Sequence, residues 1–461
     1  MRTVLRLTEA NRQLLRQHLF PGDGLEAAAL ACCGRRSGPD HEILTVQEIV
    51  LIPHEKCHRT ATRVTWPLEP ALLMLHRAGD AGLTVLKIHS HPREVTEFSP
   101  WDDSADHGVL GALFAWTDAP LLHLSAFMLE SGAIHARAVF RDGRTALVNR
   151  IMVVGDAIDI HDAGESAVEL ADHDLRNRQT FGEGTPRLLK RLEVGVVGAS
   201  GTGSWVIEML SRLGVGRLLL IDPEHVEDKN LNRIINATEA DVRADRPKVE
   251  ILRDAINRIG LDTLVEARAE DLRSPALLRR LAACDVIFGC VDSPFARSLL
   301  NTLAAHYLLP YFDVGVRLQA DGLGGISAVY GGVHYLMPGG SSLFTRGVID
   351  QDSVRADMMR RYYPEQYKQQ VAEKYIRGVA VVSPAVIPVN GVMASHAVME
   401  FLARLHSFRC VGLECTRGQQ IDLATCLWTY EDEAAPDLLL ANLAGRGDRT
   451  PLLGDPTLSD G

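Results

Sequence analysis

A glycine-rich turn between an apolar strand and a helix constrains this chain more than any other feature of its sequence. The run VGVVG leads into the turn GASGTG, with Gly198, Gly201 and Gly203, and the helical segment SWVIEMLSRLGVG follows directly. A second apolar run, RLLLID, ends in Asp222. This order predicts a βαβ unit whose glycines let the backbone approach a phosphate at a helix N-terminus. The sequence therefore predicts an α/β domain with a nucleotide site at this turn.

Polar residues downstream of Asp222 favour nucleotidyl transfer over hydride transfer. A glycine-rich turn followed by an acid fits NAD or FAD as well as ATP. The chain continues with Asn230 and Arg233 in the string KNLNR, then Lys248 after a proline, and then Asp292 at the end of the run CDVIFGCVD. Arg233 and Lys248 suit a triphosphate, and Asp292 suits Mg²⁺. A nucleotidyl transferase needs both features to stabilise the leaving pyrophosphate, whereas a hydride-transfer enzyme needs neither.

These motifs together resemble the ThiF-like adenylyltransferases, the family shared by ubiquitin-activating enzymes and bacterial activators of sulfur-carrier proteins. The resemblance runs from about residue 174 to 432 and includes GASGTGS, LLLID, NLNR, RPK, CVDSPFAR and VSPAVIPVNGVMASHAVMEFL. It implies a Rossmann-like domain that binds ATP and Mg²⁺. By the same resemblance Asp222 holds the ribose and Asp292 holds magnesium. The phosphates are held by Asn230, Arg233 and Lys248.

Two further positions bear on this resemblance. Arg178, in the string NRQTFG ahead of the first strand, matches an arginine that in this family reaches the ATP of the partner subunit. The match implies a homodimer with composite sites. Ser200 stands where the family usually has glycine. A serine fits there if its φ is negative, so we expect a changed loop but retained ATP binding.

The chain departs from the family at a structural zinc site. Many ThiF-like domains hold zinc on two C-x-x-C pairs. The first pair would fall near PGGSSLFTRG, where this chain has Ser342 and Thr345, and the second near PDLLLAN, where it has Leu438 and Ala441. Because both pairs are absent together, no zinc is expected in this domain.

A second departure concerns the thiol that accepts the adenylated tail in ubiquitin-activating enzymes. No cysteine lies between Cys290 and Cys410, the span that covers the usual position. Three routes stay open: hand-over of the adenylate to a partner, an oxyester on a serine, or a thioester on a distant cysteine. The candidate acceptors are Ser341, Ser342, Ser353, Cys410 and Cys415.

A motif in the first third of the chain has the spacing of metal ligands. In HSHPREVTEFSPWDD, His89 and His91 alternate, so both imidazoles point to one side of an extended segment. Pro92 ends the strand, and the loop brings Ser99 and then Asp102 back towards it. Two imidazoles and one carboxylate leave the fourth position of zinc open for water. Zinc lowers the pKa of that water towards ~7 and polarises a scissile carbonyl.

Glu26, in DGLEAAALACCG, could supply the missing general base, and the Ser99 hydroxyl could donate to the oxyanion. With Glu26 included, the pattern resembles the JAMM motif of JAB/MPN metallopeptidases over roughly residues 20–140. These enzymes have a cytidine-deaminase-like α/β fold and cut after the C-terminal glycines of ubiquitin-like proteins. The resemblance implies one zinc on His89, His91 and Asp102, with Glu26 as acid/base and Ser99 as oxyanion donor. A metal-free binding scaffold is the alternative.

The motifs divide the 461 residues into a JAB/MPN-like domain over 1–150, a linker with a short helix over 151–185, a ThiF-like domain over 186–432 and a polar tail over 433–461. The net charge of −11, with no basic run, argues against a nucleic-acid partner. No apolar stretch reaches the ~18 residues that span a bilayer, and the first residues do not read as a signal peptide. We therefore expect a cytoplasmic protein.

The expected function joins the two motifs on one substrate. The ThiF-like domain would adenylate the C-terminal glycine of a ubiquitin-like protein, and the zinc domain would process or deconjugate that protein. Expected partners are this protein, a conjugating enzyme and a second copy of the chain. The domain pairing suggests a bacterial ubiquitin-like conjugation system that acts in phage defence. The alternatives are a sulfur-carrier route through a thiocarboxylate, a non-catalytic scaffold for ubiquitin-like proteins, and, more distantly, a nicotinamide oxidoreductase.

Overall fold

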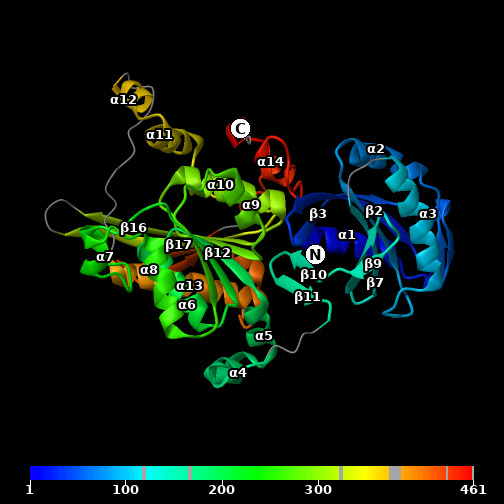
Figure 1. Ribbon diagram of the computed structural model, residues 1–461, viewed down its shortest axis with the longest axis horizontal. Coiled ribbons are helices and arrows are strands. Elements are labelled where there is room, and N and C mark those ends of the chain that lie inside the picture. The colour runs from blue at the N-terminus through cyan, green and yellow to red at the C-terminus, as the bar shows by residue number, and fades with distance from the viewer. Residues whose placement is uncertain (117–120, 165–168, 321–324, 373–385, 432–433, 459–461) are drawn as a thin grey trace. The chain divides into compact units, whose positions relative to one another are not determined.

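The computed structural model describes residues 1–116, 121–164, 169–320, 325–372, 386–431 and 434–458. The chain forms two compact units (Figure 1). The first unit comprises Met1–Ser166, His306–Leu308 and Leu443–Thr450. The second comprises Ala167–Ala305, Leu309–Asn442 and Pro451–Gly461.

The first unit is built on a nine-stranded mixed sheet with strand order β11-β10-β1-β3-β2-β6-β7-β8-β9. β6 (Thr84–Ser90) lies between β2 and β7, and all of its residues are buried. Strands covered on both faces are normally apolar throughout, so the polar Lys87 and His89 within β6 are unusual. The other strands are β1 (Arg2–Thr8), β2 (Ala28–Ser37), β3 (His41–Leu51), β7 (Leu122–Met128), β8 (Ile134–Phe140), β9 (Thr145–Leu147), β10 (Arg150–Val154) and β11 (Ile158–Asp162).

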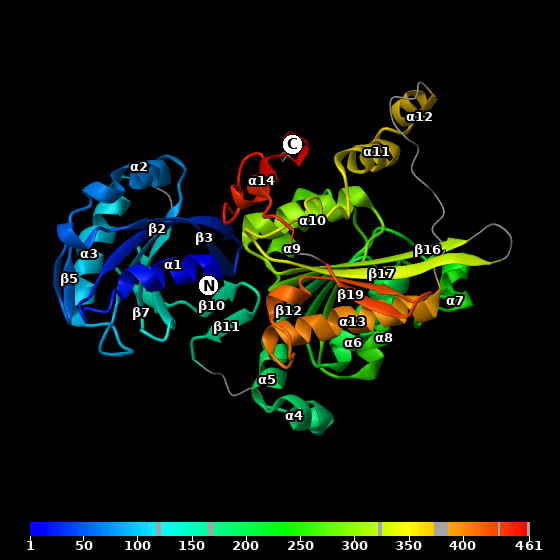
Figure 2. The same cartoon turned by 180° about the vertical axis from the view of Figure 1, so that it is seen from behind.

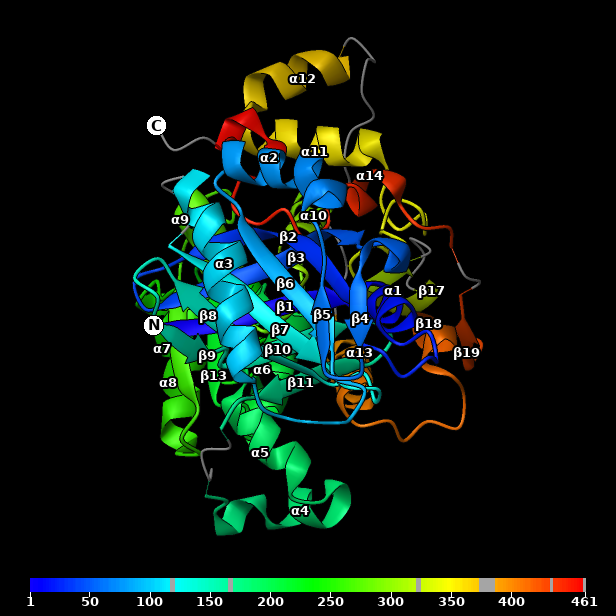
Figure 3. The same ribbon diagram turned by 90° about the vertical axis from the view of Figure 1, so that its right-hand side faces the viewer.

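Helices cover both faces of this sheet. Ile88 of β6 belongs to the core that α1 seals, and Val85 belongs to the core that α2 and α3 seal. Because side chains alternate along a strand, His89 points to the same face as Val85. Figure 3 shows α3 lying across that face. The helices are α1 (Glu9–Leu19), α2 (Leu72–Asp80) and α3 (Pro100–Trp116), and a separate hairpin pairs β4 (His58–Thr60) with β5 (Arg63–Thr65).

A late segment of the chain, residues 443–450, completes the first unit. Gly447 forms a parallel bridge with Arg35 of β2, and Thr45 Oγ1 donates to the carbonyl oxygen of Gly445 at 2.7 Å. Gly447 has a φ of +61°, and a side chain at this position would overlap the backbone of Arg35. The close approach therefore requires glycine. This part of the predicted polar tail is packed against a sheet.

The second unit has an eight-stranded sheet with order β14-β13-β12-β15-β16-β17-β18-β19. The strands from β14 to β16 are parallel, and the strands from β16 to β19 are antiparallel. The strands are β12 (Glu193–Val197), β13 (Arg217–Ile221), β14 (Leu264–Arg268), β15 (Val286–Gly289), β16 (Tyr311–Ala320), β17 (Ile326–Leu336), β18 (Gly418–Asp422) and β19 (Leu427–Tyr430).

The parallel part of this sheet is covered by helices on both faces. Figures 1 and 2 show α9 and α10 on one face and α6, α8 and α13 on the other. This arrangement is the doubly wound architecture that alternating strands and helices predict. The helices are α4 (Leu175–Phe181), α5 (Gly184–Arg191), α6 (Gly201–Arg212), α7 (Glu239–Arg243), α8 (Lys248–Ile259), α9 (Pro275–Ala282), α10 (Pro294–Tyr307), α11 (Gln351–Tyr362), α12 (Pro364–Ala372), α13 (Ile387–Leu405) and α14 (Leu438–Ala441).

The Rossmann-like βαβ order predicted from the glycine-rich turn is confirmed, because β12, α6 and β13 follow one another and the two strands are parallel neighbours. The stretch 151–185, predicted as a linker with a short helix, contains that helix as α4 but also a strand. It begins inside β10 and contains β11, which extends the sheet of the first unit, followed by α4 and the start of α5. None of the described helices combines the length and apolar character needed to cross a lipid bilayer.

Candidate functional sites

The two histidines of the first motif lie at the end of β6. His89 is the sixth residue of that strand, and His91 follows it directly. Their Nε2 atoms are 3.0 Å apart, and both side chains are buried. His91 Nδ1 contacts the carbonyl oxygen of Val95 at 2.7 Å, which fixes the proton on Nδ1 and leaves Nε2 with its lone pair.

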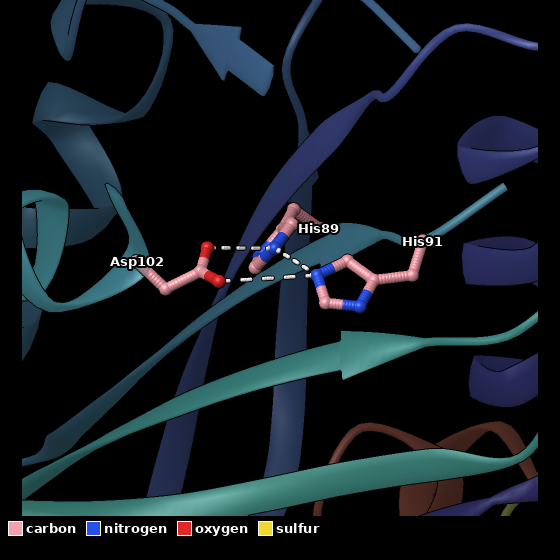
Figure 4. Close-up of side chains that lie close together, drawn as sticks. All are labelled: His89, His91 and Asp102. Atoms are coloured by element: carbon pink, nitrogen blue, oxygen red, sulfur yellow. Dashed lines mark hydrogen bonds and ion pairs between the residues drawn. The ribbon is translucent and has the colours of Figure 1, made fainter. Parts of the chain in front are cut away.

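Asp102 reaches the same point from the first turn of α3 (Figure 4). Its Oδ1 lies 3.0 Å from His89 Nε2, and its Oδ2 lies 3.9 Å from His91 Nε2. The backbone N–H and the hydroxyl of Ser99 both donate to Oδ2 at 2.7 Å. Burial alone would raise the pKa of Asp102, but the hydrogen bonds from His89 and Ser99 hold that pKa well below its ordinary value. The carboxylate is therefore ionised at neutral pH.

The three ligand atoms fit a tetrahedral metal ion. The donor atoms of His89, His91 and Asp102 all lie within 4.8 Å of one another. Ligands at the usual zinc distances of about 2.0–2.2 Å in a tetrahedron lie about 3.4 Å apart, close to the observed separations. Two facing imidazole nitrogens and one ionised carboxylate are also the donor set that zinc prefers.

Glu26 lies beside this cluster because of strand pairing. β2 pairs with β6 so that Ala28 faces His89, and Glu26 precedes that position by two residues. Arg59 of the β4–β5 hairpin donates to the Glu26 carbonyl oxygen at 2.8 Å, which anchors the backbone. The side chain is 6% exposed, and burial together with the charge of Asp102 raises the pKa of Glu26 to about 8. A carboxyl group with this pKa can both accept and donate a proton near neutral pH.

Two supporting residues of this cluster carry no sequence signal. Phe127 of β7 stacks on the ring of His91 with centroids 4.1 Å apart, which restricts the rotation of that ring. Arg137 of β8 donates to Asp103 and Asp106 of α3 and packs over Phe98 at 4.0 Å. It therefore ties α3 to the loop that precedes Ser99. Strand pairing places both residues here, and no local pattern reveals it.

The glycine-rich turn of the second unit has the close backbone contacts expected of a phosphate site. Gly198 has a φ of +94°, and a side chain on Gly203 would overlap the carbonyl oxygen of Gly198. Ser200 has a φ of −92°, which meets the condition under which a serine fits this position. Asp222 Oδ2 accepts the N–H of Ala199 at 2.7 Å, so the acid at the end of β13 holds the turn from behind. Burial raises the pKa of Asp222.

The predicted phosphate ligands lie at different depths. Lys248, the first residue of α8, is 2% exposed and forms an ion pair with Glu224. The side-chain methylenes of Arg233 come near Gly201 of the turn, and its Nη1 donates to the carbonyl oxygen of Lys229 at 2.6 Å.

Asn230, Asp292 and Arg178 are the remaining residues that the sequence predicts at this site. Asn230 is buried and accepts the N–H of Glu227, so here it shapes the loop. Asp292 follows β15 and is 87% exposed, with Arg361 of α11 at 4.0 Å. Arg178 lies on α4, and its predicted role on a partner's nucleotide stays a prediction.

The segments around Ser342 and Asp437 are joined by direct hydrogen bonds. Ser342 Oγ donates to Asp437 Oδ2 at 2.6 Å, and the N–H of Asp437 donates to the carbonyl oxygen of Gly340 at 3.0 Å. Both Ser342 and Asp437 are buried. This hydrogen bond links Ser342 to the residue that precedes Leu438.

The second unit has the architecture and the turn of a nucleotide-binding α/β protein. The model of the ThiF family matches residues 174–430, more than half of the chain, and the chain belongs to this family. Ubiquitin-like modifier-activating enzyme 5 of Culex quinquefasciatus is 27% identical over 168 residues, which cover 34% of this chain and 40% of that protein. The same enzyme of Aedes aegypti is 29% identical over 168 residues, with the same coverage.

The chain thus spans about two fifths of the length of these curated relatives. Among solved structures, E. coli MccB with ATP is similar at 17% identity and a TM-score of 0.44, over 58% of this chain and 74% of that chain.

Proposed function

We propose that the second unit adenylates the C-terminal glycine of a ubiquitin-like protein at the expense of ATP. The observation that carries the proposal is the glycine-rich turn with Asp222 behind it and Lys248 buried nearby, in a chain of the ThiF family. Similarity to ubiquitin-like modifier-activating enzymes supports the choice of acyl substrate. In the reaction, a carboxylate oxygen of the glycine attacks the α-phosphorus of ATP, the bond to the bridging oxygen breaks, and pyrophosphate leaves.

In this proposal the acidic side chains bind the ribose and Mg²⁺, and the basic side chains bind the phosphates. Asp222 would accept from the ribose hydroxyls, and Arg233 and Lys248 would neutralise the phosphates. Because Lys248 forms an ion pair with Glu224, its ammonium is held in place before ATP binds. Asp292 is the carboxylate that would hold Mg²⁺, and Mg²⁺ commonly takes one or two carboxylates together with phosphates and water. Bound Mg²⁺ would supply charge neutralisation for the leaving pyrophosphate.

The first unit is proposed as a zinc-dependent peptidase or isopeptidase that acts on the same ubiquitin-like protein. His89, His91 and Asp102 would hold the single zinc, which when bound would activate a water and polarise a carbonyl. Glu26 would take a proton from the attacking water and give it to the leaving amine, as its raised pKa permits. Ser99 would turn its hydroxyl from Asp102 to the oxyanion.

A homodimer through the second unit is supported by an apolar surface on α6, α13 and β19. A cavity of about 810 Å³ opens there. Met399 and Trp428, two of its lining residues, are 44% and 52% exposed. Large exposed apolar patches commonly mark protein interfaces. Light scattering of the Trp428→Glu variant tests the dimer, which is expected to dissociate, and an unchanged mass would count against this surface.

The fate of the adenylate stays open between three routes. Cys410 and Cys415 are exposed, whereas Ser342 is buried with its hydroxyl bound to Asp437. Exposure favours the cysteines over Ser342 as an acceptor. A conjugating enzyme is the proposed recipient, within a ubiquitin-like conjugation system that serves phage defence.

ATP–pyrophosphate exchange with a candidate ubiquitin-like protein ending in glycine tests the adenylation. Lys248→Met is expected to reduce exchange about a hundredfold, because it removes a buried cation from the phosphates. Lys368→Met, which replaces an exposed lysine of α12, is the matched control. Exchange that is independent of the glycine, or equal in Lys248→Met and wild type, would contradict the proposal. Thiocarboxylate as the final product would identify the sulfur-carrier route.

Cleavage of a C-terminally extended ubiquitin-like protein tests the peptidase. Wild type is expected to contain one zinc per chain and to cleave, whereas Glu26→Gln should keep the zinc and lose cleavage. About two zinc ions per chain would overturn the assignment of a single site. A chain that binds neither zinc nor ATP would be the non-catalytic scaffold.

A further inference from the structure

A buried amide faces the glycine-rich turn from α13. Asn390 lies in the first turn of this helix and is 3% exposed. A side chain built on Gly201 would overlap the Nδ2 atom of Asn390, so the amide occupies the space beside the turn that the glycine leaves free. Helices α6 and α13 lie side by side on one face of the sheet (Figures 1 and 2).

One end of this amide is engaged and the other is not. The hydroxyl of Thr202 donates to Asn390 Oδ1 at 3.3 Å. Nδ2 is buried and has no hydrogen-bond acceptor among the residues that the structure describes. The contact with Thr202 orients the amide so that its donor group points at Gly201. Arg233 Cδ lies 3.4 Å from the same free space beside Gly201.

An unpaired buried donor destabilises the protein in which it stands, because it loses its water without gaining an acceptor. Leucine or methionine at this position would fill the space without that cost. A donor that is kept beside a phosphate-binding turn and an arginine therefore points to an acceptor that arrives with a ligand. Because the glycine-rich turn and Arg233 both suit an anion, we expect this acceptor to be an anionic oxygen.

We propose that Asn390 Nδ2 donates a hydrogen bond to a phosphate oxygen of the nucleotide held at the glycine-rich turn. The inference rests on the proposed function to the extent that the turn binds ATP. It adds a binding residue from α13, far along the chain from the other proposed phosphate ligands. The carboxylate of the acyl substrate offers the same chemistry, and the experiment separates the two sources.

Equilibrium binding of Mg-ATP and of adenosine, without any protein partner, tests the proposal in the full chain. Asn390→Leu removes the donor at similar volume and is expected to weaken ATP binding about tenfold to a hundredfold, as for a hydrogen bond to a charged group. Adenosine, which lacks phosphate, is expected to bind wild type and variant equally. Lys368→Met, which replaces an exposed lysine of α12, is the control for ATP binding.

The unfolding temperature of the nucleotide-free protein provides a second readout, which should not fall when ATP affinity falls. Because Asn390→Leu removes an unpaired buried donor, the variant is expected to unfold at the same or a higher temperature than wild type while binding ATP more weakly. A merely structural role would lower both. Asn390→Ala, which leaves space in place of the amide, must show the same loss of ATP affinity.

The results distinguish a failure of the role proposed for Asn390 from a failure of the proposed function. Wild-type affinity for ATP in both variants would overturn the role of Asn390 and leave the proposed function intact. The same result with a raised KM for the acyl substrate would assign the amide to the carboxylate and would also overturn it. A wild-type chain that does not bind Mg-ATP would refute the proposed function itself.

Discussion

Replacing Glu26 with glutamine should make the metal-free first unit less sensitive to alkaline pH. The pKa of Glu26 is raised from 4.5 to about 8 in the folded chain, first by burial and then by the charge of Asp102. The folded state thus holds a proton that the unfolded state releases above pH 4.5. The stability associated with the neutral carboxyl is full below pH 4.5 and is lost as the pH rises towards 8.

The size of this effect follows from the shift. At about 1.4 kcal/mol per pKa unit, raising the pH from 5 to 8 should lower the free energy of unfolding by about 3 kcal/mol through Glu26 alone. Glutamine cannot ionise, so Glu26→Gln should be more stable than wild type by about this amount at pH 8 and nearly equal to it at pH 5. Bound zinc should shrink the difference, because a nearby cation lowers the pKa of a carboxyl group.

Hydrogen exchange of β6 peptides measures this stability within the full chain, since two units need not unfold in one transition. Chelated wild type, Glu26→Gln and Glu69→Gln are compared at both pH values. Glu69 belongs to the same unit and its side chain is 70% exposed, so its variant should follow wild type. If chelated wild type and Glu26→Gln protect β6 equally at pH 8, Glu26 is not buried beside Asp102.

Three further perturbations have simple readouts. His91→Ala should reduce the zinc content measured by elemental analysis from one per chain to none. Gly203→Ala should abolish ATP binding and lower the unfolding temperature, because its methyl group overlaps backbone, whereas Gly184→Ala lies in open space and should change stability by at most about 1 kcal/mol. Asp437→Ala removes the bond from Ser342 and the cap of α14, so denaturant unfolding should show a loss of about 2 kcal/mol with unchanged zinc content.

The cluster of His89, His91 and Asp102 illustrates what local spacing predicts. Strand alternation brought His89 and His91 together, and the short loop returned Asp102 to them, so the sequence predicted these three neighbours. The place of Glu26 depends on the pairing of β2 with β6, which no local pattern specifies. The same limit hides Phe127, which reaches His91 only through the pairing of β6 with β7.

At the glycine-rich turn, too, local sequence predicts some neighbours but not those that come from distant elements. The order of strand, turn and helix predicted β12, α6 and the place of Asp222. Asn390 comes from a helix more than a hundred residues further along the chain and reaches Gly201 only through tertiary packing. The sequence does not reveal β11 within the stretch 151–185, because the Asp, His and Gly residues there suit a loop. An edge strand such as β11 tolerates them, since it needs only one paired neighbour.

Because residues 443–450 pack against β2 and β3, the first unit cannot be completed until the ribosome has made nearly the whole chain. Its sheet leaves the ribosome early, but the segment that completes it is made only after nearly all of the second unit. At ordinary elongation rates the nascent first unit therefore waits for tens of seconds with this surface uncovered. A stop codon just before residue 443 would therefore remove a segment that packs on β2 and β3, although it lies far from them in the gene.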